Sequence, residues 1–168
     1  MDQCTICCDQ SSEIQSINGK PYCSKCLAPP EFKVMQTSFL DGRECDLLVE
    51  SIVMESNLEK MAADQFLKYR QHNAGGGMSG SETYDARKDR TRMLSIAIPH
   101  YKNNLNDTLL ILERMVGLGW FTRIDQSYDK NWIVSMVNNT KWMREMTMTD
   151  TIQEGICLTA LKVAKKGF

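Results

Sequence analysis

The feature that most constrains this chain is a cluster of cysteines near its N-terminus. Five of the seven cysteines lie between Cys4 and Cys26, and the segment 8–22 separates two Cys-x2-Cys pairs. Two thiolates two residues apart share one face of a metal ion, and two such pairs complete the tetrahedron that structural zinc prefers. The sequence therefore predicts a closed, structural Zn²⁺ site held by Cys4, Cys7, Cys23 and Cys26.

Other roles for these cysteines stay open: a redox pair, an iron–sulfur cluster, or unrelated free thiols. Cys8 can also replace Cys7, which would leave the segment 9–22 between the pairs. A segment of about 30 residues has too small a core to fold alone, so we expect metal binding to drive its folding. Asn18-Gly19 lies between the pairs and predicts a tight hairpin turn that folds the second pair back on the first.

The composition excludes several classes of protein. With 20 Lys and Arg against 21 Asp and Glu, the net charge of −1 argues against a histone-like protein or an acidic tail protein. The N-terminus lacks the basic-then-apolar pattern of a signal peptide, and no run of about 18 apolar residues predicts a membrane span. An odd number of clustered cysteines argues against a disulfide scaffold, so we predict a reducing, cytoplasmic compartment. The lack of a long apolar run predicts no membrane partner.

The pattern along the chain predicts an α+β fold in four segments. Residues 1–30 form the zinc finger, 31–73 a helical connector, 74–92 a flexible Gly-rich and basic linker, and 93–168 an α/β domain. In the connector, Asp41 with Glu44 and Ser56 with Glu59 each match a helix capping box. Apolar residues at helical spacing follow both boxes; they are Cys45, Leu48, Val49, Ile52 and Val53, then Leu58, Met61, Ala62, Phe66 and Tyr69.

The last segment mixes strand and helix patterns. Alternating Leu94, Ile96 and Ile98 predict a short strand that stops at Pro99. A helix capped by Asn106 or Asp107 follows, then strands over 120–124 and 131–137, and a third strand near Trp142. Thr151 with Glu154 predicts the cap of a final helix. Buried roles are expected for Cys45 and Cys157 and for the three tryptophans, Trp120, Trp132 and Trp142.

Two stretches resemble known families. Asn18-Gly19-Lys20-Pro21-Tyr22-Cys23-Ser24-Lys25-Cys26 resembles the second knuckle of LIM-type and related treble-clef zinc fingers, and the four-Cys layout is similar to GATA-type fingers and zinc ribbons. This resemblance is confined to the segment 1–30, and the second set of four ligands of a complete LIM domain is absent. It implies a partner that is protein or nucleic acid, without choosing between them.

The order of elements in 93–168 is similar to a winged-helix domain, with the strands over 120–137 as the wing. This resemblance implies DNA contact by the helix before the wing. A helix that reads the major groove needs polar side chains, and residues 109–116 are apolar nearly all round. The pattern therefore favours a core helix. Where that helix is not buried, Leu110 and Ile111 would form an apolar surface for a protein partner.

Basic residues suggest where phosphates would bind. Arg87, Lys88, Arg90 and Arg92 form the densest positive cluster and follow the Gly-rich stretch, as a mobile basic arm would. Arg123 and Lys130 lie on the predicted wing, and Lys141 with Arg144 would extend one basic face. The alternative is an ordinary solvated, charged surface.

These patterns predict a non-enzymatic zinc-binding regulator that acts at nucleic acid, in transcription. The alternative is an adaptor or inhibitor that docks on a larger protein through an apolar helix surface. His72 and His100 have no acidic or cysteine partner at a recognisable catalytic spacing, so the sequence predicts no catalytic residue and no small-molecule substrate.

Overall fold

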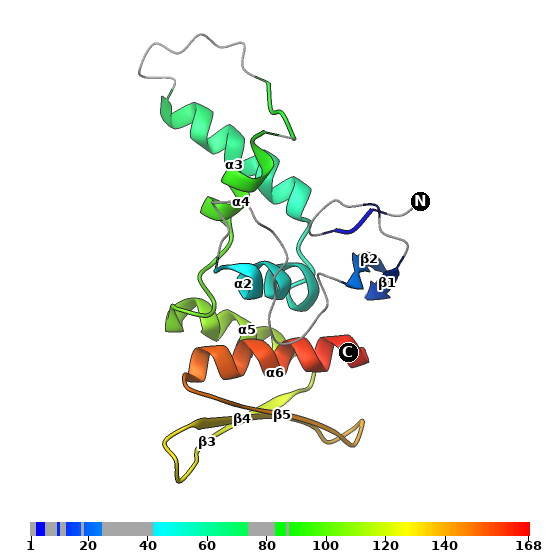
Figure 1. The fold of residues 1–168 in the computed structure, drawn as a ribbon, viewed down its shortest axis with the longest axis vertical. Helices are drawn as coiled ribbons and strands as arrows, with labels where there is room; N and C mark the ends of the chain where they lie inside the picture. Colours follow the sequence, from blue (N-terminus) through cyan, green and yellow to red (C-terminus); the bar gives the residue numbers. More distant parts are fainter. Residues whose placement is uncertain are drawn as a thin grey trace.

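A computed structural model of the chain describes residues 3–5, 10, 13–17, 19–24, 42–73, 83–86 and 88–168. The chain forms a two-stranded hairpin, a run of helices, a three-stranded antiparallel sheet and a final helix, which confirms the predicted α+β class (Figure 1). The elements in chain order are β1 (Ile14–Ile17), β2 (Lys20–Cys23), α2 (Glu44–Leu48), η1 (Val49–Val53), α3 (Leu58–Asn73), α4 (Arg90–Ala97), α5 (Leu105–Gly117), β3 (Phe121–Gln126), β4 (Trp132–Asn138), β5 (Met143–Thr149) and α6 (Ile152–Lys166).

The N-terminal hairpin forms where the sequence predicts it. Strands β1 and β2 pair antiparallel with Ile17 opposite Lys20, so the connection is formed by positions 18 and 19. Gly19 has a φ of 75°, a conformation that glycine adopts without the steric cost other residues bear. The predicted hairpin is thus confirmed, although Asn18 itself lies outside the described residues.

The connector helices bury the predicted apolar stripes, but their N-cap residues differ from the predicted ones. The continuous helix α2–η1 buries its whole stripe, and α3 buries Leu58, Ala62 and Phe66. Helix α3 is capped by Asn57, whose side chain accepts the Lys60 N–H at 3.1 Å, and not by Ser56. Helix α2 begins at Glu44 with Arg43 at the N-cap position, so the predicted Asp41 cap is wrong as well. The N-cap is the residue after which the backbone dihedrals become helical, and the spacing of apolar residues does not specify that residue.

The strand predicted over residues 94–98 is wrong, because Arg90–Ala97 form helix α4. Arg90, Met93 and Leu94 lie on one buried side of this helix, which packs on α3. Ile96 stays exposed on the other side. Alternation over three apolar residues does not separate a strand from a short helix when a neighbouring helix covers one side. Ile98 leaves the helix in an extended conformation before Pro99, as the residue before a proline favours.

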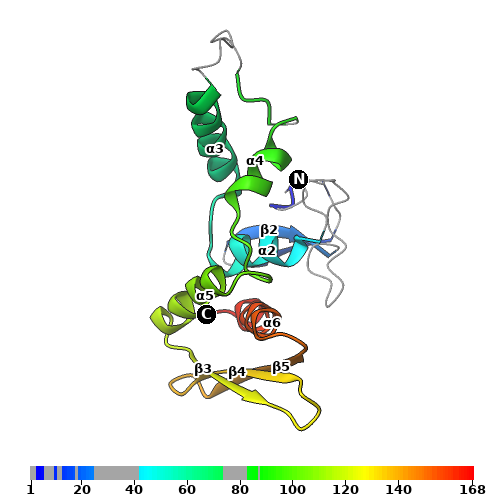
Figure 2. The ribbon, with the colours of Figure 1, turned by 90° about the vertical axis from the view of Figure 1, so that its left-hand side faces the viewer.

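The C-terminal part is a three-stranded antiparallel sheet in the order β3-β4-β5, covered on one face by α5 and α6 (Figure 2). Helix α2–η1 packs against α6, so α6 lies between the sheet and the connector. Thr151 caps α6 as predicted, since its hydroxyl accepts the Glu154 N–H at 3.3 Å. A Cβ at Gly155 would lie 2.5 Å from Cγ2 of Val134, so this position needs glycine for the helix to approach the sheet.

The three tryptophans have different environments. Trp120 is completely buried and Trp132 partly so, whereas Trp142 is 94% exposed, which contradicts its predicted core role. The side chain of Asn138 accepts the N–H groups of Thr140 and Lys141 at 3.1 and 3.0 Å, which forms the turn between β4 and β5. Trp142 ends this turn with a φ of 53°, and the third strand begins one residue later.

The hairpin β3–β4, expected as a wing, is part of a larger sheet. Strand β5 pairs with β4 along the whole length of both strands, and α6 packs on both. The winged-helix resemblance stays a prediction, as do the segment boundaries. The predicted Gly-rich stretch 74–82 lies outside the described residues.

Candidate functional site

Two of the four predicted zinc ligands lie in neighbouring buried segments. Cys4 and Cys23 are each 1% exposed. The N–H and hydroxyl of Thr5 both donate to the Pro21 carbonyl, at 2.8 and 2.9 Å, so the segment carrying Cys4 lies beside β2. Two buried thiols on adjoining segments suit half of a thiolate tetrahedron. Cys7, Cys26 and the alternative Cys8 lie outside the described residues.

Within the described residues no three His, Cys, Asp or Glu side chains are grouped as a metal site. Because that part of the chain lacks two of the four predicted ligands, the zinc site stays a prediction. Zinc bound by four thiolates would have no open position and would act as a structural cross-link between the two segments.

The hairpin is also held by contacts with the connector. The Tyr22 hydroxyl lies 2.8 Å from the Ser51 hydroxyl, in a buried hydrogen bond. The Lys20 ammonium donates to the carbonyl oxygens of Glu55 and Ser56, both at 2.9 Å. A change in the hairpin would therefore be transmitted to η1 and to the start of α3.

Removal of zinc by a chelator is expected to lower the thermal unfolding midpoint, because metal that binds only the folded chain stabilises it, by about 4 kcal/mol at a thousandfold excess over Kd. Native mass spectrometry and thermal unfolding measure the metal content and the shift. Cys7→Ser should lose the metal and Cys8→Ser should keep it. A folded, metal-free protein with an unchanged midpoint would disprove the site.

The structure separates the predicted phosphate-binding residues. Arg87 lies outside the described residues, and Lys88 is exposed. Arg90 is 6% exposed; its guanidinium bonds the Glu59 carboxylate and donates to the Thr5 carbonyl at 3.1 Å. Arg90 therefore connects α4 to α3 and to the N-terminal segment, and little of its guanidinium group is exposed for contact with a phosphate. Arg92 lies over the Tyr69 ring, 5.1 Å from its centroid.

The other two candidates lie at the far end of the molecule. Arg123 pairs with Asp125 on β3 at 2.8 Å, and Lys130 is exposed in the β3–β4 turn. Figure 1 shows α4 and β3 far apart along the long axis of the molecule. The five of these residues that the structure describes thus form no single basic face, and nucleic-acid binding stays a prediction.

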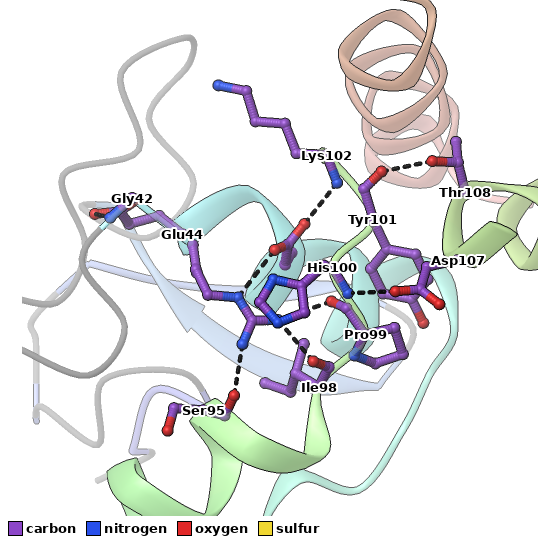
Figure 3. Close-up of polar contacts among 12 residues, drawn as sticks. Gly42, Glu44, Ser95, Ile98, Pro99, His100, Tyr101, Lys102, Asp107 and Thr108 are labelled. Carbon is purple, nitrogen blue, oxygen red and sulfur yellow. Dashed lines mark hydrogen bonds and ion pairs between the residues drawn. The ribbon is translucent and has the colours of Figure 1, made fainter. Parts of the chain in front are cut away.

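A cluster of buried polar side chains, which we call the polar junction, joins α2–η1 to α4 and to the segment before α5. It consists of the side chains of Arg43, Asp46, Glu50 and Tyr101 together with the Lys102 backbone N–H, and Figure 3 shows the polar contacts around Tyr101 and Lys102. Asp46 is 1% exposed and accepts from Arg43 Nε at 3.1 Å and from the Lys102 N–H at 2.8 Å. Arg43 also donates to the carbonyl oxygens of Ser95, Ile98 and Pro99, at 2.6, 2.6 and 2.9 Å.

Glu50 completes the polar junction from the next turn of the helix. Its two carboxylate oxygens accept from the hydroxyls of Tyr101 and Ser56. Asp46 and Glu50 are four residues apart, so they lie on the same side of the helix, beside the apolar stripe. This spacing is the one feature of the sequence that could have indicated a pair of buried acids. Sequence reasoning missed them because their partners are distant in the chain.

The polar junction is not part of the lining of two surface hollows among the described residues. One hollow of about 300 Å³ is lined by residues that include Cys4, Lys20 and Glu59, and another of about 380 Å³ by residues that include Lys68, Tyr69 and His72. Asp46, Glu50 and Tyr101 line neither of these two. The His100 backbone N–H donates to Asp107 at 2.8 Å. The buried polar groups satisfy one another, as structural networks do.

Alkaline pH is expected to destabilise the protein through Tyr101. Burial, and then its hydrogen bond to Glu50, raise the pKa of Tyr101 above its ordinary value of 10.0. A raised pKa in the folded state means that this stability is fully present below about pH 10 and is lost above it, at about 1.4 kcal/mol per pH unit. Urea unfolding at several alkaline pH values, with tyrosinate absorbance, measures the loss.

The exposed Tyr128 supplies the control for this pH dependence. Tyr128→Phe should leave the alkaline loss of stability unchanged, because its side chain is fully exposed in both states. Burial raises the pKa of Tyr22 as well, so Tyr101→Phe should reduce the loss without abolishing it. A free energy of unfolding that stays flat above the ordinary tyrosine pKa would contradict the assignment.

Helix α5 exposes a second feature, an apolar stripe. Leu105, Leu109 and Val116 are 51%, 45% and 58% exposed, and Leu112 is half-buried beside them. We call these four residues the α5 stripe. An adjacent side of the helix, about 100° around its axis, buries Thr108, Ile111 and Met115. Of the two residues predicted as an apolar surface, Leu110 is exposed, whereas Ile111 is buried, because the core lies on its side of the helix.

Comparison of the chain with protein-family models, with curated proteins and with solved structures finds no match. Among the described residues, no helix has both the length and the apolar character to span a membrane.

Proposed function

We propose that this protein is a non-enzymatic, zinc-stabilised adaptor that docks on an amphipathic helix of a larger protein through the α5 stripe. The observation that supports this most is the exposure of three large aliphatic side chains in a row on one well-formed helix. Aligned apolar side chains of this size on a surface are typical of interaction sites.

The spacing of the α5 stripe suits a helix as the partner. Leu105, Leu109, Leu112 and Val116 follow one another at intervals of four, three and four, the seam of a coiled coil. From Leu105 to Val116 the helix rises about 17 Å, which is about three turns. Such a seam accepts leucine-sized side chains from an adjacent helix between its own.

A flanking charge specifies the chemistry of that partner. Glu113 lies beside the α5 stripe on the exposed side of the helix and forms no ion pair within the described residues. Charges that flank a coiled-coil seam select the partner by complementarity. The partner helix should therefore carry Lys or Arg next to its apolar stripe.

Helix α5 is held rigidly behind this surface. Asn104 caps it by accepting the Asn106 N–H at 2.9 Å, and Arg114 pairs with Glu55 and donates to the Val53 carbonyl at 3.4 Å. Ile111 and Met115 anchor it in the core. A surface on a pre-ordered helix loses less conformational entropy when it binds.

Two synthetic helical peptides test the proposal. Both carry leucines at coiled-coil spacing; one has Lys and the other Glu at the flanking positions. By fluorescence anisotropy, the Lys-flanked peptide should bind the full chain more tightly, and Leu109→Asp should weaken it at least about tenfold. Glu113→Lys should reverse the preference between the peptides. Leu67→Asp, at an exposed leucine of α3, is the matched control and should bind normally.

Two results would contradict the proposal. One is equal affinity of the Lys-flanked peptide for the natural chain and for a folded Leu109→Asp variant. The other is steeply salt-dependent binding to duplex DNA or RNA that Leu109→Asp leaves unchanged, with no peptide binding, which would support the nucleic-acid prediction instead.

A further inference from the structure

The sheet β3-β4-β5 has one face with no helix over it among the described elements. The opposite face meets α6, where the Thr147 hydroxyl donates to the Gly155 carbonyl at 3.0 Å. Successive side chains of a strand point to opposite faces, so the residues between the helix-facing ones point away. Figure 2 shows the helices on one side of the sheet. The outer face has three rows across β3, β4 and β5: Phe121, Val137 and Arg144; Arg123, Ser135 and Met146; Asp125, Ile133 and Met148.

This outer face is unusually apolar. Phe121, Met146 and Met148 are 61%, 49% and 57% exposed, and Ile133 and Val137 are half-buried between them. An antiparallel sheet with one solvated face normally alternates apolar residues inside with polar residues outside. Five apolar residues among nine on this face indicate a face that another surface covers.

Two of the three charges of the outer face lie at opposite corners, and the third, Arg123, lies on the β3 edge beside Asp125. Arg144 ends the first row on β5, and Asp125 begins the third row on β3. Arg144 forms no ion pair in the described part of the chain, whereas Asp125 pairs with its neighbour Arg123. The uncharged corners are Phe121 and Met148, and the small residue Ser135 is at the centre.

This pattern is complementary to itself. A two-fold axis along the diagonal from Phe121 to Met148 would exchange the other two corners, so that each Arg144 faces the partner's Asp125. The three rows span about 14 Å along the strands and about 10 Å across them, so the diagonal exchange brings the two charged corners to within about 6 Å of each other, a gap that the long arginine side chain can span. The strands of the two sheets would then cross at about 70°, closer to the orthogonal than to the aligned class of sheet packing.

We propose that the outer face binds a second copy of this chain in a symmetric, face-to-face dimer of the two sheets. Phe121 packs on the partner's Phe121, Ile133 packs on the partner's Met146, and two Arg144–Asp125 pairs form at the rim. Symmetric dimers are the commonest protein assemblies and use one self-complementary surface. Nine residues from each copy make an interface below the standard size, so we expect weak, reversible association.

Charge reversal tests this pairing in the full chain. Arg144→Asp and Asp125→Arg should each weaken the dimer at least about tenfold in sedimentation equilibrium, because each places like charges opposite one another twice. Mixing the two variants should restore association as a heterodimer, because both of its rim pairs are again of opposite charge, whereas both rim pairs of either homodimer are of like charge. Thermal unfolding of each variant verifies that it is folded.

The α5 stripe supplies the control that separates this inference from the proposed function. Leu109→Asp should abolish peptide binding and leave the dimer intact, whereas Phe121→Ser should do the reverse. A chain that is monomeric up to roughly millimolar concentration would overturn the dimer. So would a dimer that both charge reversals leave unchanged, or one that Leu109→Asp dissociates.

Discussion

Replacing Asp46 with alanine is expected to lower the free energy of unfolding by about 3–5 kcal/mol. Asp46 is buried and accepts hydrogen bonds from Arg43 and from the Lys102 N–H. The Arg43 side chain is only 11% exposed, so the substitution leaves a largely buried cation without its carboxylate. Equilibrium unfolding in urea, at a pH well below the tyrosine range, measures the change.

A second substitution at Asp46 and a control at an exposed aspartate separate the specific role of this carboxylate from a general effect of removing an acidic side chain. Asp46→Asn keeps one acceptor of similar size and should cost less than Asp46→Ala. Asp129→Ala removes an acidic side chain from the exposed β3–β4 turn and should change stability by no more than about 0.5 kcal/mol. If Asp46→Ala were no more destabilising than Asp129→Ala, the polar junction would not hold α4 to the connector.

Replacing Trp120 with alanine is expected to destabilise the protein by about 3–5 kcal/mol as well, through the cavity it leaves. Trp120 is completely buried where the chain passes from α5 to β3, and its backbone N–H donates to the Met115 carbonyl at 2.9 Å. Loss of the indole would loosen the contact between α5 and the sheet. Thermal unfolding and near-ultraviolet circular dichroism report the stability and the packing.

Two further substitutions, Trp120→Phe and Trp142→Ala, test whether the loss of stability comes from the cavity at Trp120. The Trp120 indole N–H has no hydrogen-bond partner among the described residues, so Trp120→Phe breaks no hydrogen bond and should cost clearly less than Trp120→Ala. Trp142→Ala, at the exposed tryptophan, should stay within about 0.5 kcal/mol of the natural chain. Equal effects at Trp120 and Trp142 would refute the packing described here.

The local elements of the C-terminal part were largely predictable from sequence. Thr151 caps its helix, the strands after Trp120 and before Asn138 occur within two residues of their predicted bounds, and the N-terminal hairpin turns at positions 18 and 19. These features depend on contacts between residues close in the chain, which a short sequence pattern records.

Helix α4 and Trp142 show where such patterns fail. The alternation of Leu94, Ile96 and Ile98 was a strand pattern, yet the buried side of that segment is set by α3, which lies well before it in the chain. Trp142 looked like a core residue, but the Asn138 turn places it in solvent. Hydrophobicity indicates that a side chain tends to be buried, and only the packed neighbours determine whether it is.

The candidate surfaces depend on the same distinction. By itself the sequence determined the cysteine spacing, the helical register of the α5 stripe and the alternation of the strands, because these are periodic and local. Only the tertiary structure decided that Arg90 is buried in an ion pair, that Asp46 and Glu50 meet partners far along the chain, and that one face of the sheet carries none of the described helices. Those outcomes depend on which elements pack together, a long-range choice that no short stretch of residues encodes.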